Sequence, residues 1–150
     1  MKKGVYFIFV CSALFFISGC NRVSLKCTRN SESSYDFGST YEKYNIVFKN
    51  DVVYKFDSIM EVTLSENTLS SDPNIIDSLA DTTTSSFPNL LDKKGVSYSV
   101  SKKKDGFTSK LKINFDKLDG ETKKSVTLIN YKGSYSENKK SLESVGFECK

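Results

Sequence analysis

The chain has 150 residues, with 22 lysines and arginines against 18 aspartates and glutamates, and a net charge of +4. This length suits one domain with a real core, and so small a basic excess gives no argument for a nucleic-acid partner. The chain contains no histidine, which removes the commonest general base and excludes a Ser-His-Asp or Cys-His arrangement. We therefore expect no enzymatic activity, no cofactor and no metal site.

The N-terminal segment has a basic head, Met1-Lys2-Lys3, followed by an apolar block of 13 residues, 5–17. This block is too short to span a bilayer, which takes about 20 apolar residues. A basic head, a short apolar stretch and small residues after it are typical of a secretory signal. We predict that residues 1–19 are a signal peptide and that residues 20–150 form one α+β domain exposed in the cell envelope. Removal of the signal lowers the basic excess from four to two.

The signal ends in Ile17-Ser18-Gly19-Cys20, an aliphatic residue followed by two small residues and a cysteine. This tetrapeptide resembles the lipobox of bacterial lipoproteins. The resemblance implies cleavage before Cys20 and a diacylglycerol, with acyl chains such as palmitate, on its thiol. Two acyl chains hold a protein firmly on a membrane, so the expected location is the extracytoplasmic side of the cell membrane. The alternatives are an ordinary secretory signal, with Cys20 present by chance, and an uncleaved anchor.

The chain has cysteines at positions 11, 20, 27 and 149. Cys11 leaves with the signal and Cys20 carries the lipid, so Cys27 and Cys149 remain near the two ends of the mature chain. Exported proteins can keep disulfides, and we predict a bond between these two residues. Two free thiols are the alternative.

The first half of the mature chain predicts three strands. Residues 23–27 alternate between apolar and polar, as in a half-buried strand, so the tether after the anchor is very short. Residues 29–40 are polar and predict a loop. Residues 41–49 and 52–64 predict a hairpin around Asn50-Asp51. One face of its second strand is expected to carry Tyr54, Phe56, Met60, Val62 and Leu64.

A helix is predicted between two hairpins, after a polar connector at 65–71. Asp72 is expected to cap it, Pro73 to occupy its first turn, and Pro88 to end or kink it. The threonine and serine run at 82–86 weakens helix propensity and favours a frayed end. The apolar face contains Ile75, Ile76, Leu79, Ala80, Thr83 and Phe87.

Residues 96–102 and 107–115 predict the second hairpin, with its turn at 103–106. Residues 116–133 carry the weakest pattern and belong either to an edge strand or to a packed loop. The apolar residues in that stretch are Val126, Leu128 and Tyr131.

A last helix is predicted from a capping box formed by Ser134 and Glu137. It is expected to end near Val145, with Gly146 as a left-handed cap. Leu142 and Val145 are expected to face inward.

These elements predict an α+β fold: an antiparallel β-sheet of two hairpins plus an N-terminal strand, with two helices packed on one face. Four features are distinctive: the lipobox, the early cysteine in the first strand, the helix between hairpins, and the ending Ser-Leu-Glu-Ser-Val-Gly-Phe-Glu-Cys-Lys. In these features the chain is similar to the small YehR-like lipoproteins of bacteria. The resemblance implies a fold and a cellular address, and it implies no activity.

Several residue groups are candidate sites. The lysine clusters at 93–94, 102–104, 123–124 and 139–140 suit contact with anionic lipid or wall polymer, but solvated turns and helix faces explain them better. Ser101-Lys102 is a poor nucleophile pair because adjacent strand residues point to opposite faces. Two further groups are better explained by capping, solvation and core packing: the aspartates Asp72, Asp77 and Asp81 as cation ligands, and the tyrosines Tyr41, Tyr44, Tyr54 and Tyr98 as a sugar-stacking surface.

The expected function is that of a non-enzymatic binding domain, held to the lipid bilayer through Cys20. Its partner is an envelope polymer, a small ligand or another protein. An accessory or structural subunit of a membrane protein complex is the alternative. A hydrolase that uses carboxylates or a Ser-Lys pair ranks last, because histidine and catalytic motifs are absent from the sequence.

Overall fold

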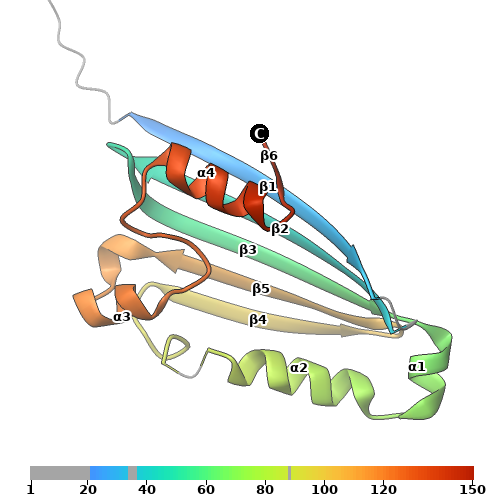
Figure 1. The fold of residues 1–150 in the computed structure, drawn as a ribbon. Coiled ribbons are helices and arrows are strands. Elements are labelled where there is room, and N and C mark those ends of the chain that lie inside the picture. The colour runs from blue at the N-terminus through green and yellow to red at the C-terminus, as the bar shows by residue number, and fades with distance from the viewer. Residues whose placement is uncertain (1–20, 34–36, 88) are drawn as a thin grey trace, which may run out of the picture.

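The structure is a computed structural model that describes residues 21–33, 37–87 and 89–150. In these ranges six strands form one antiparallel sheet in the order β4-β5-β3-β2-β1-β6 (Figure 1). The strands are β1 (Arg22–Glu32), β2 (Gly38–Lys49), β3 (Val52–Leu64), β4 (Val96–Lys103), β5 (Gly106–Asn114) and β6 (Glu148–Cys149). The helices are α1 (Glu66–Ser71), α2 (Ile75–Ser85), η1 (Phe115–Lys117), α3 (Gly120–Ser125) and α4 (Tyr135–Ser144). The α+β class and the antiparallel sheet are confirmed.

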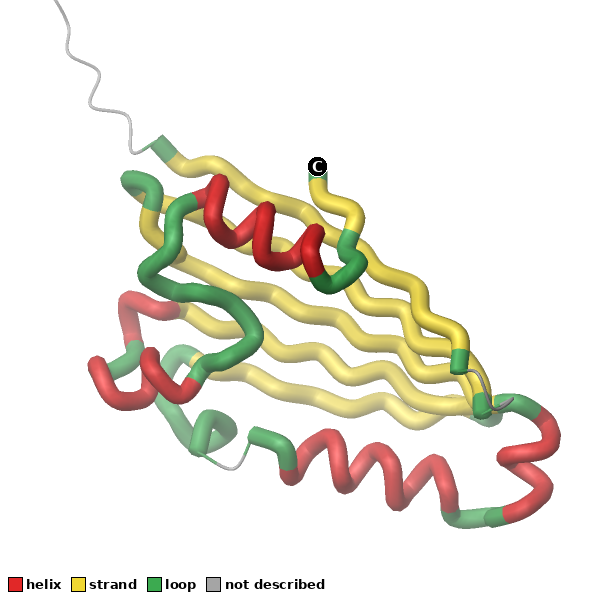
Figure 2. Tube along the Cα trace, viewed as in Figure 1, coloured by secondary structure: helices red, strands yellow, loops and turns green. Residues whose placement is uncertain are grey.

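The helices lie on one side of the sheet, and the core fills the space between the two layers (Figure 2). A cross-strand row that joins Leu25, Ile46, Phe56 and Ile113 forms its centre, and each of these side chains is at most 2% exposed. From the helical layer, Leu142, Val126 and Ile129 close over the row. Since strand residues alternate between faces, the polar residues between these positions face away from the helices.

The segment expected to be a loop at 29–40 is mostly strand. β1 continues to Glu32 and β2 begins at Gly38, with Glu32 opposite Ser39 in the register. Residues at the exposed end of a long hairpin need no apolar partners, because backbone hydrogen bonds alone continue the ladder there. Because the segment is mostly polar, it lacks the alternation of apolar and polar residues from which a strand is predicted.

The turn between β2 and β3 is confirmed, with Asn50 and Asp51 at φ angles of 53° and 60°. The predicted parity of β3 is wrong at Tyr54. Phe48 pairs with Val53 whereas Val47 pairs with Lys55, so Tyr54 is the extra residue of a β-bulge. The bulge turns its ring away from the core, toward the opposite face of the sheet.

The connector expected at 65–71 contains helix α1, and the Ser65 hydroxyl accepts a hydrogen bond from Thr68 N–H at 3.2 Å. The cap of α2 is Asn74, and Asp72 was predicted wrongly as that cap. Asp72 instead forms the preceding turn, where its Oδ1 accepts from Asn74 N–H at 2.8 Å. The helix therefore begins two residues later than Pro73.

The threonine run does not fray α2, which continues to Ser85. Thr82, Thr83 and Thr84 donate their hydroxyls to the carbonyls of Ser78, Leu79 and Ala80. These bonds satisfy the threonine hydroxyls within the helix, so the run is compatible with a continuous α2.

The stretch 116–133 is a packed segment that contains α3, and it forms no strand. Asn138 of α4 holds its end, because Nδ2 donates to the carbonyls of Asn130 and Gly133 at 2.9 and 3.0 Å. The capping box of Ser134 and Glu137 is confirmed.

The left-handed Gly146 after α4 is confirmed by its φ of 91°. Val145 is 56% exposed, so its predicted inward position is wrong, whereas Leu142 is buried as expected. Val145 falls at the helix end, where the chain turns from the core toward β6.

The Cys27–Cys149 disulfide is present and joins β1 to β6, closing a sequence separation of 122 residues. Cys20 and the predicted signal at 1–19 lie outside the described residues. Among the helices of the described ranges, none has both the length and the apolar composition that a membrane crossing requires.

The disulfide should carry much of the stability of the domain. We expect Cys27→Ala combined with Cys149→Ala to lower the free energy of unfolding by about 2–5 kcal/mol, since the bond restricts a long loop of the unfolded chain. Urea unfolding of residues 21–150, with and without reductant, measures this change. Reductant should destabilise the wild type and leave the double variant unchanged; equal stability of both proteins without reductant would contradict the prediction.

Candidate functional site

Helix α2 does not seal against the sheet, and a groove of about 280 Å³ remains between them. We call it the α2 groove. Its floor consists of two neighbouring cross-strand rows on the inner face of the sheet. The floor residues are Glu42, Tyr44, Ser58, Met60, Tyr98, Ser109 and Leu111. The walls are formed by Thr82, Thr83, Ser86, Phe87 and Leu128.

The groove exists because short side chains stand where large apolar ones would fill the core. Ser58 lies between Phe56 and Met60 on the inward face of β3, and Ser109 occupies the matching kind of position on β5. Above them, α2 presents threonines whose hydroxyls already donate to their own helix. Small residues on both sides thus keep the helix and the sheet apart at this place.

Tyr98 supplies an unused polar group to the groove. Its hydroxyl is enclosed and has no hydrogen-bond partner among the described residues. Its ring packs against Phe87 with 5.9 Å between centroids, which fixes the side chain. A buried hydroxyl without a partner costs about 1–3 kcal/mol of stability. A ligand that forms a hydrogen bond with this oxygen removes that cost.

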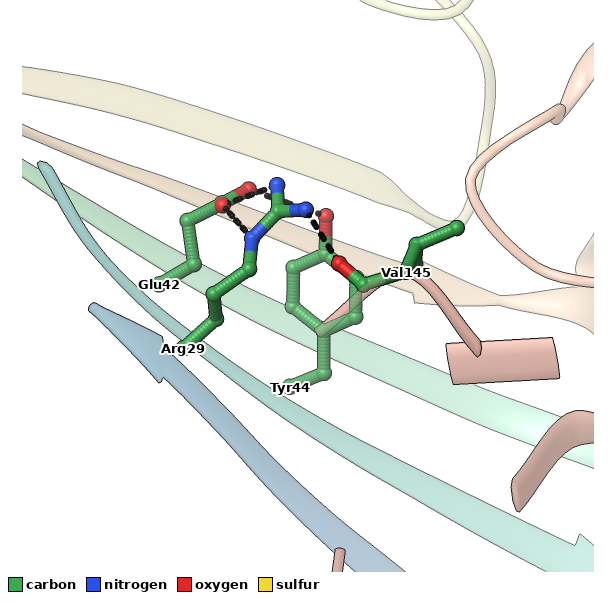
Figure 3. Close-up of polar contacts among 4 residues, drawn as sticks. All are labelled: Arg29, Glu42, Tyr44 and Val145. Carbon is green, nitrogen blue, oxygen red and sulfur yellow. Dashed lines mark hydrogen bonds and ion pairs between the residues drawn. The ribbon is translucent and has the colours of Figure 1, made fainter. Parts of the chain in front are cut away.

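Arg29, Glu42 and Tyr44 form a polar cluster at one end of the groove (Figure 3). Arg29 Nε donates to Glu42 Oε2 at 2.8 Å, and Arg29 Nη1 donates to the Val145 carbonyl at 2.9 Å. The guanidinium also lies 4.6 Å from the Phe147 ring centroid. The cluster therefore joins β1 and β2 to the end of α4, and it neutralises a carboxylate that is only 13% exposed.

Tyr44 completes the cluster by donating its hydroxyl to Glu42 Oε1 at 3.4 Å. Burial, followed by the negative charge of Glu42 and this hydrogen bond, raises the pKa of Tyr44 to about 12, against a lowering effect of Arg29. The phenol is therefore a proton donor at any physiological pH. With Tyr98 it gives the groove two hydroxyls within a partly apolar surface.

Apart from two tyrosines, the residues singled out from the sequence do not line this groove. Cys27 and Cys149 form the disulfide, with Cys27 paired to the floor residue Tyr44, and Lys102 pairs with Asp77 across β4 and α2. Ser101 lies on the opposite face of β4 from Lys102, as expected from alternation. Within the described part of the chain, no group of three or more His, Cys, Asp or Glu residues is placed to hold a metal ion.

The four tyrosines considered for sugar stacking divide between the two faces. Tyr44 and Tyr98 line the groove, whereas Tyr41 and Tyr54 belong to the outer face. The sequence reasoning missed Ser58 and Ser109 as site residues. Their signal was present: each is a small polar residue at a position whose parity is otherwise apolar.

No protein-family model matches the chain, and no curated protein matches it. A solved NMR structure of a protein from Streptococcus pneumoniae TIGR4 is similar, with a TM-score of 0.57 and 10% sequence identity. The similarity covers 100% of this chain and 98% of that one. At this identity the match shows a shared fold alone.

The raised pKa of Tyr44 has a measurable consequence in alkali. Between pH 10 and about 12 the unfolded chain loses the phenol proton and the native chain keeps it, so stability should fall as the pH rises through this range. Tyr44→Phe should remove this part of the loss. Carbon-13 NMR of ring-labelled tyrosine follows the titration directly, and the resonance missing from Tyr44→Phe assigns it.

Glu42→Gln separates the causes of that shift. It should lower the pKa of Tyr44 but leave it above the ordinary value of 10, because burial is the largest cause and remains. A Tyr44 resonance that titrates at 10 in the wild type would contradict the proposed environment.

Proposed function

We propose that this chain is a bacterial lipoprotein, anchored through a diacylglycerol on Cys20, whose folded domain binds a small ligand in the α2 groove. Binding is non-enzymatic in this proposal. The observation that carries it is the enclosed, unpartnered hydroxyl of Tyr98 in a groove of about 280 Å³. Ligand sites are typically concave and mainly apolar, with a few placed polar groups, and the groove has this composition.

The anchor is supported by the sequence Ile17-Ser18-Gly19-Cys20, which resembles a lipobox and follows a short apolar block. The disulfide is compatible with it, since structural disulfides persist outside the reducing cytosol. The resemblance to the YehR-like lipoproteins belongs to the same proposal.

The ligand class follows from the lining of the groove. Met60, Leu111 and Leu128 suit an apolar body, and the Tyr98 hydroxyl suits one hydrogen-bonding group on it. Glu42 is already paired with Arg29, so no free charge within the groove calls for a charged partner. A small, largely apolar molecule with a hydrogen-bonding end fits best.

The anchor can be tested in cells by detergent-phase partitioning. The wild type should enter the detergent phase, and Cys20→Ala should move the protein to the aqueous phase or to an unprocessed precursor, because the acyl chains provide the membrane affinity. Cys11→Ala is the matched control, since that residue lies within the predicted signal and should change nothing. Unchanged partitioning of mature Cys20→Ala protein would contradict the anchor.

The groove can be tested by a thermal-shift panel of sugars, peptides, cell-wall fragments and small amphiphiles on residues 21–150 with the disulfide intact. A ligand at 100 times its Kd stabilises a protein by about 2.7 kcal/mol, which raises the midpoint visibly. Tyr98→Phe, which keeps the ring, should weaken the shift at least fivefold in apparent Kd. Thr83→Leu should abolish it by filling the groove, while the helix keeps its propensity.

Tyr41→Phe is the control, because it removes a hydroxyl from the opposite face of the sheet. A shift that survives both Tyr98→Phe and Thr83→Leu would place the ligand elsewhere. No shift for any compound would contradict the groove as a small-ligand site and would favour the alternative of an accessory subunit with a protein partner.

A further inference from the structure

The bulge in β3 creates a cationic corner where β1 begins, at the upper left of the sheet in Figure 1. Arg22, Lys49 and Lys55 surround the ring of Tyr54, at 5.1, 5.9 and 5.3 Å from its centroid. No ion pair within the described residues joins any of them to a carboxylate. Three cations on one ring repel each other, and only the ring's own electron density offsets this.

An apolar side chain stands beside these charges. Val52, which pairs with Lys49 at the tip of the hairpin, is 50% exposed. Two carboxylates lie two residues from these cations and have other partners: Asp51 accepts a hydrogen bond from Tyr135 N–H at 2.9 Å, and Asp57 accepts one from Asn45 Nδ2 at 3.5 Å. An exposed valine, a tyrosine ring and unpaired basic residues are the combination found where proteins meet the membrane–water interface.

The corner is also the point where the chain leaves the fold. Cys20 precedes Arg22 by two residues, which span at most about 7 Å when extended. If Cys20 carries the lipid, the corner lies at the depth of the lipid headgroups. The depth of the corner at the headgroups rests on the proposed anchor, whereas the residue composition of the corner is independent of it.

The basic character continues along the outer face of the sheet. Exposed lysines alternate along the strands with buried residues, and the carboxylates on this face are Glu32, Asp57, Glu61 and, at the edge, Glu148. The lysines are Lys26, Lys43, Lys110 and Lys112. The helices of the described residues lie on the other side, so this face is open.

We propose that the corner formed by Arg22, Lys49, Val52, Tyr54 and Lys55 docks on the anionic phospholipid surface of the membrane. The three cations meet lipid phosphates, and Val52 and the tyrosine ring enter the boundary between headgroups and acyl chains. The residues that line the α2 groove, such as Met60 and Ser109, lie farther along the strands, so docking at this end does not cover them.

The first test measures binding of residues 21–150 to vesicles by co-sedimentation at low salt. This segment contains every described strand and helix and the disulfide, and its melting curve verifies folding. One set of vesicles is pure phosphatidylcholine, and the other contains about 30% of the anionic lipid phosphatidylglycerol. We expect binding to the anionic vesicles alone, weakened by salt.

The decisive variant combines Arg22→Gln, Lys49→Gln and Lys55→Gln. Each basic residue near such a surface contributes roughly fivefold, so the triple variant should bind about 100-fold more weakly. The matched control combines Lys123→Gln, Lys124→Gln and Lys139→Gln, which removes the same charge from the helical side and should retain most of the affinity. An equal loss in both variants would assign the binding to net charge and overturn the proposal.

The second test reports position, and it uses the absence of tryptophan from the sequence. Val52→Trp should be quenched by brominated lipid in anionic vesicles. Phe37→Trp, at the opposite end of β2 and β3, should not be quenched. The reverse pattern, or no quenching of either probe despite binding, would overturn the proposal.

These tests use a protein without Cys20, so they are independent of the lipid anchor. Vesicle binding with unchanged detergent partitioning of Cys20→Ala would retain the docking surface and reject the anchor. Loss of the anchor in Cys20→Ala, together with no preference for anionic vesicles, would retain the proposed lipoprotein and reject the docking surface.

Discussion

Alternation along the five long strands divides the sheet into a buried face and an open one, and both proposed surfaces depend on this division. The row from Leu25 to Ile113 draws the helical layer onto one side, where burial of each large apolar side chain contributes about 1.5–3 kcal/mol. The other side is mostly polar and rich in exposed lysine, with Val47 and Ile59 among its few aliphatic residues. The groove is a gap in the packing of the buried face, and the cationic corner is a cluster of basic residues on the open face.

The groove lowers the stability of the fold, and a domain with only a structural role would gain nothing from that loss. Replacing Ser58 or Ser109 by a larger apolar residue would let the sheet meet α2, as Phe56 and Leu111 meet the other helices and loops. The present residues instead leave a cavity and an enclosed Tyr98 hydroxyl, and both lower stability. The Arg29–Glu42–Tyr44 cluster keeps the opening in shape by fixing β1 and β2 to the end of α4.

The sequence predicted those features whose causes are local. The capping box at Ser134, the turn at Asn50-Asp51 and the left-handed Gly146 are determined within a few residues, and the structure contains each of them. The disulfide followed from the elimination of two other cysteines. The bulge at Tyr54 was missed because it depends on how β3 pairs with β2, and it moved this ring to the opposite face. The groove was missed because it arises only when α2 is placed over the sheet; the sequence shows the serines but not the space between them.

The bulge also determines the composition of the cationic corner. Without the extra residue, Tyr54 would keep the parity of Phe56 and point into the core near the start of β1. The bulge places it outside, among Arg22, Lys49 and Lys55, and leaves Val53 to fill the core position. The end of the sheet nearest the predicted anchor is therefore tightly packed inside and cationic outside, while the groove opens farther along the strands. In the proposed arrangement the domain would be held at that end, and docking on the membrane would not cover the residues that line the groove.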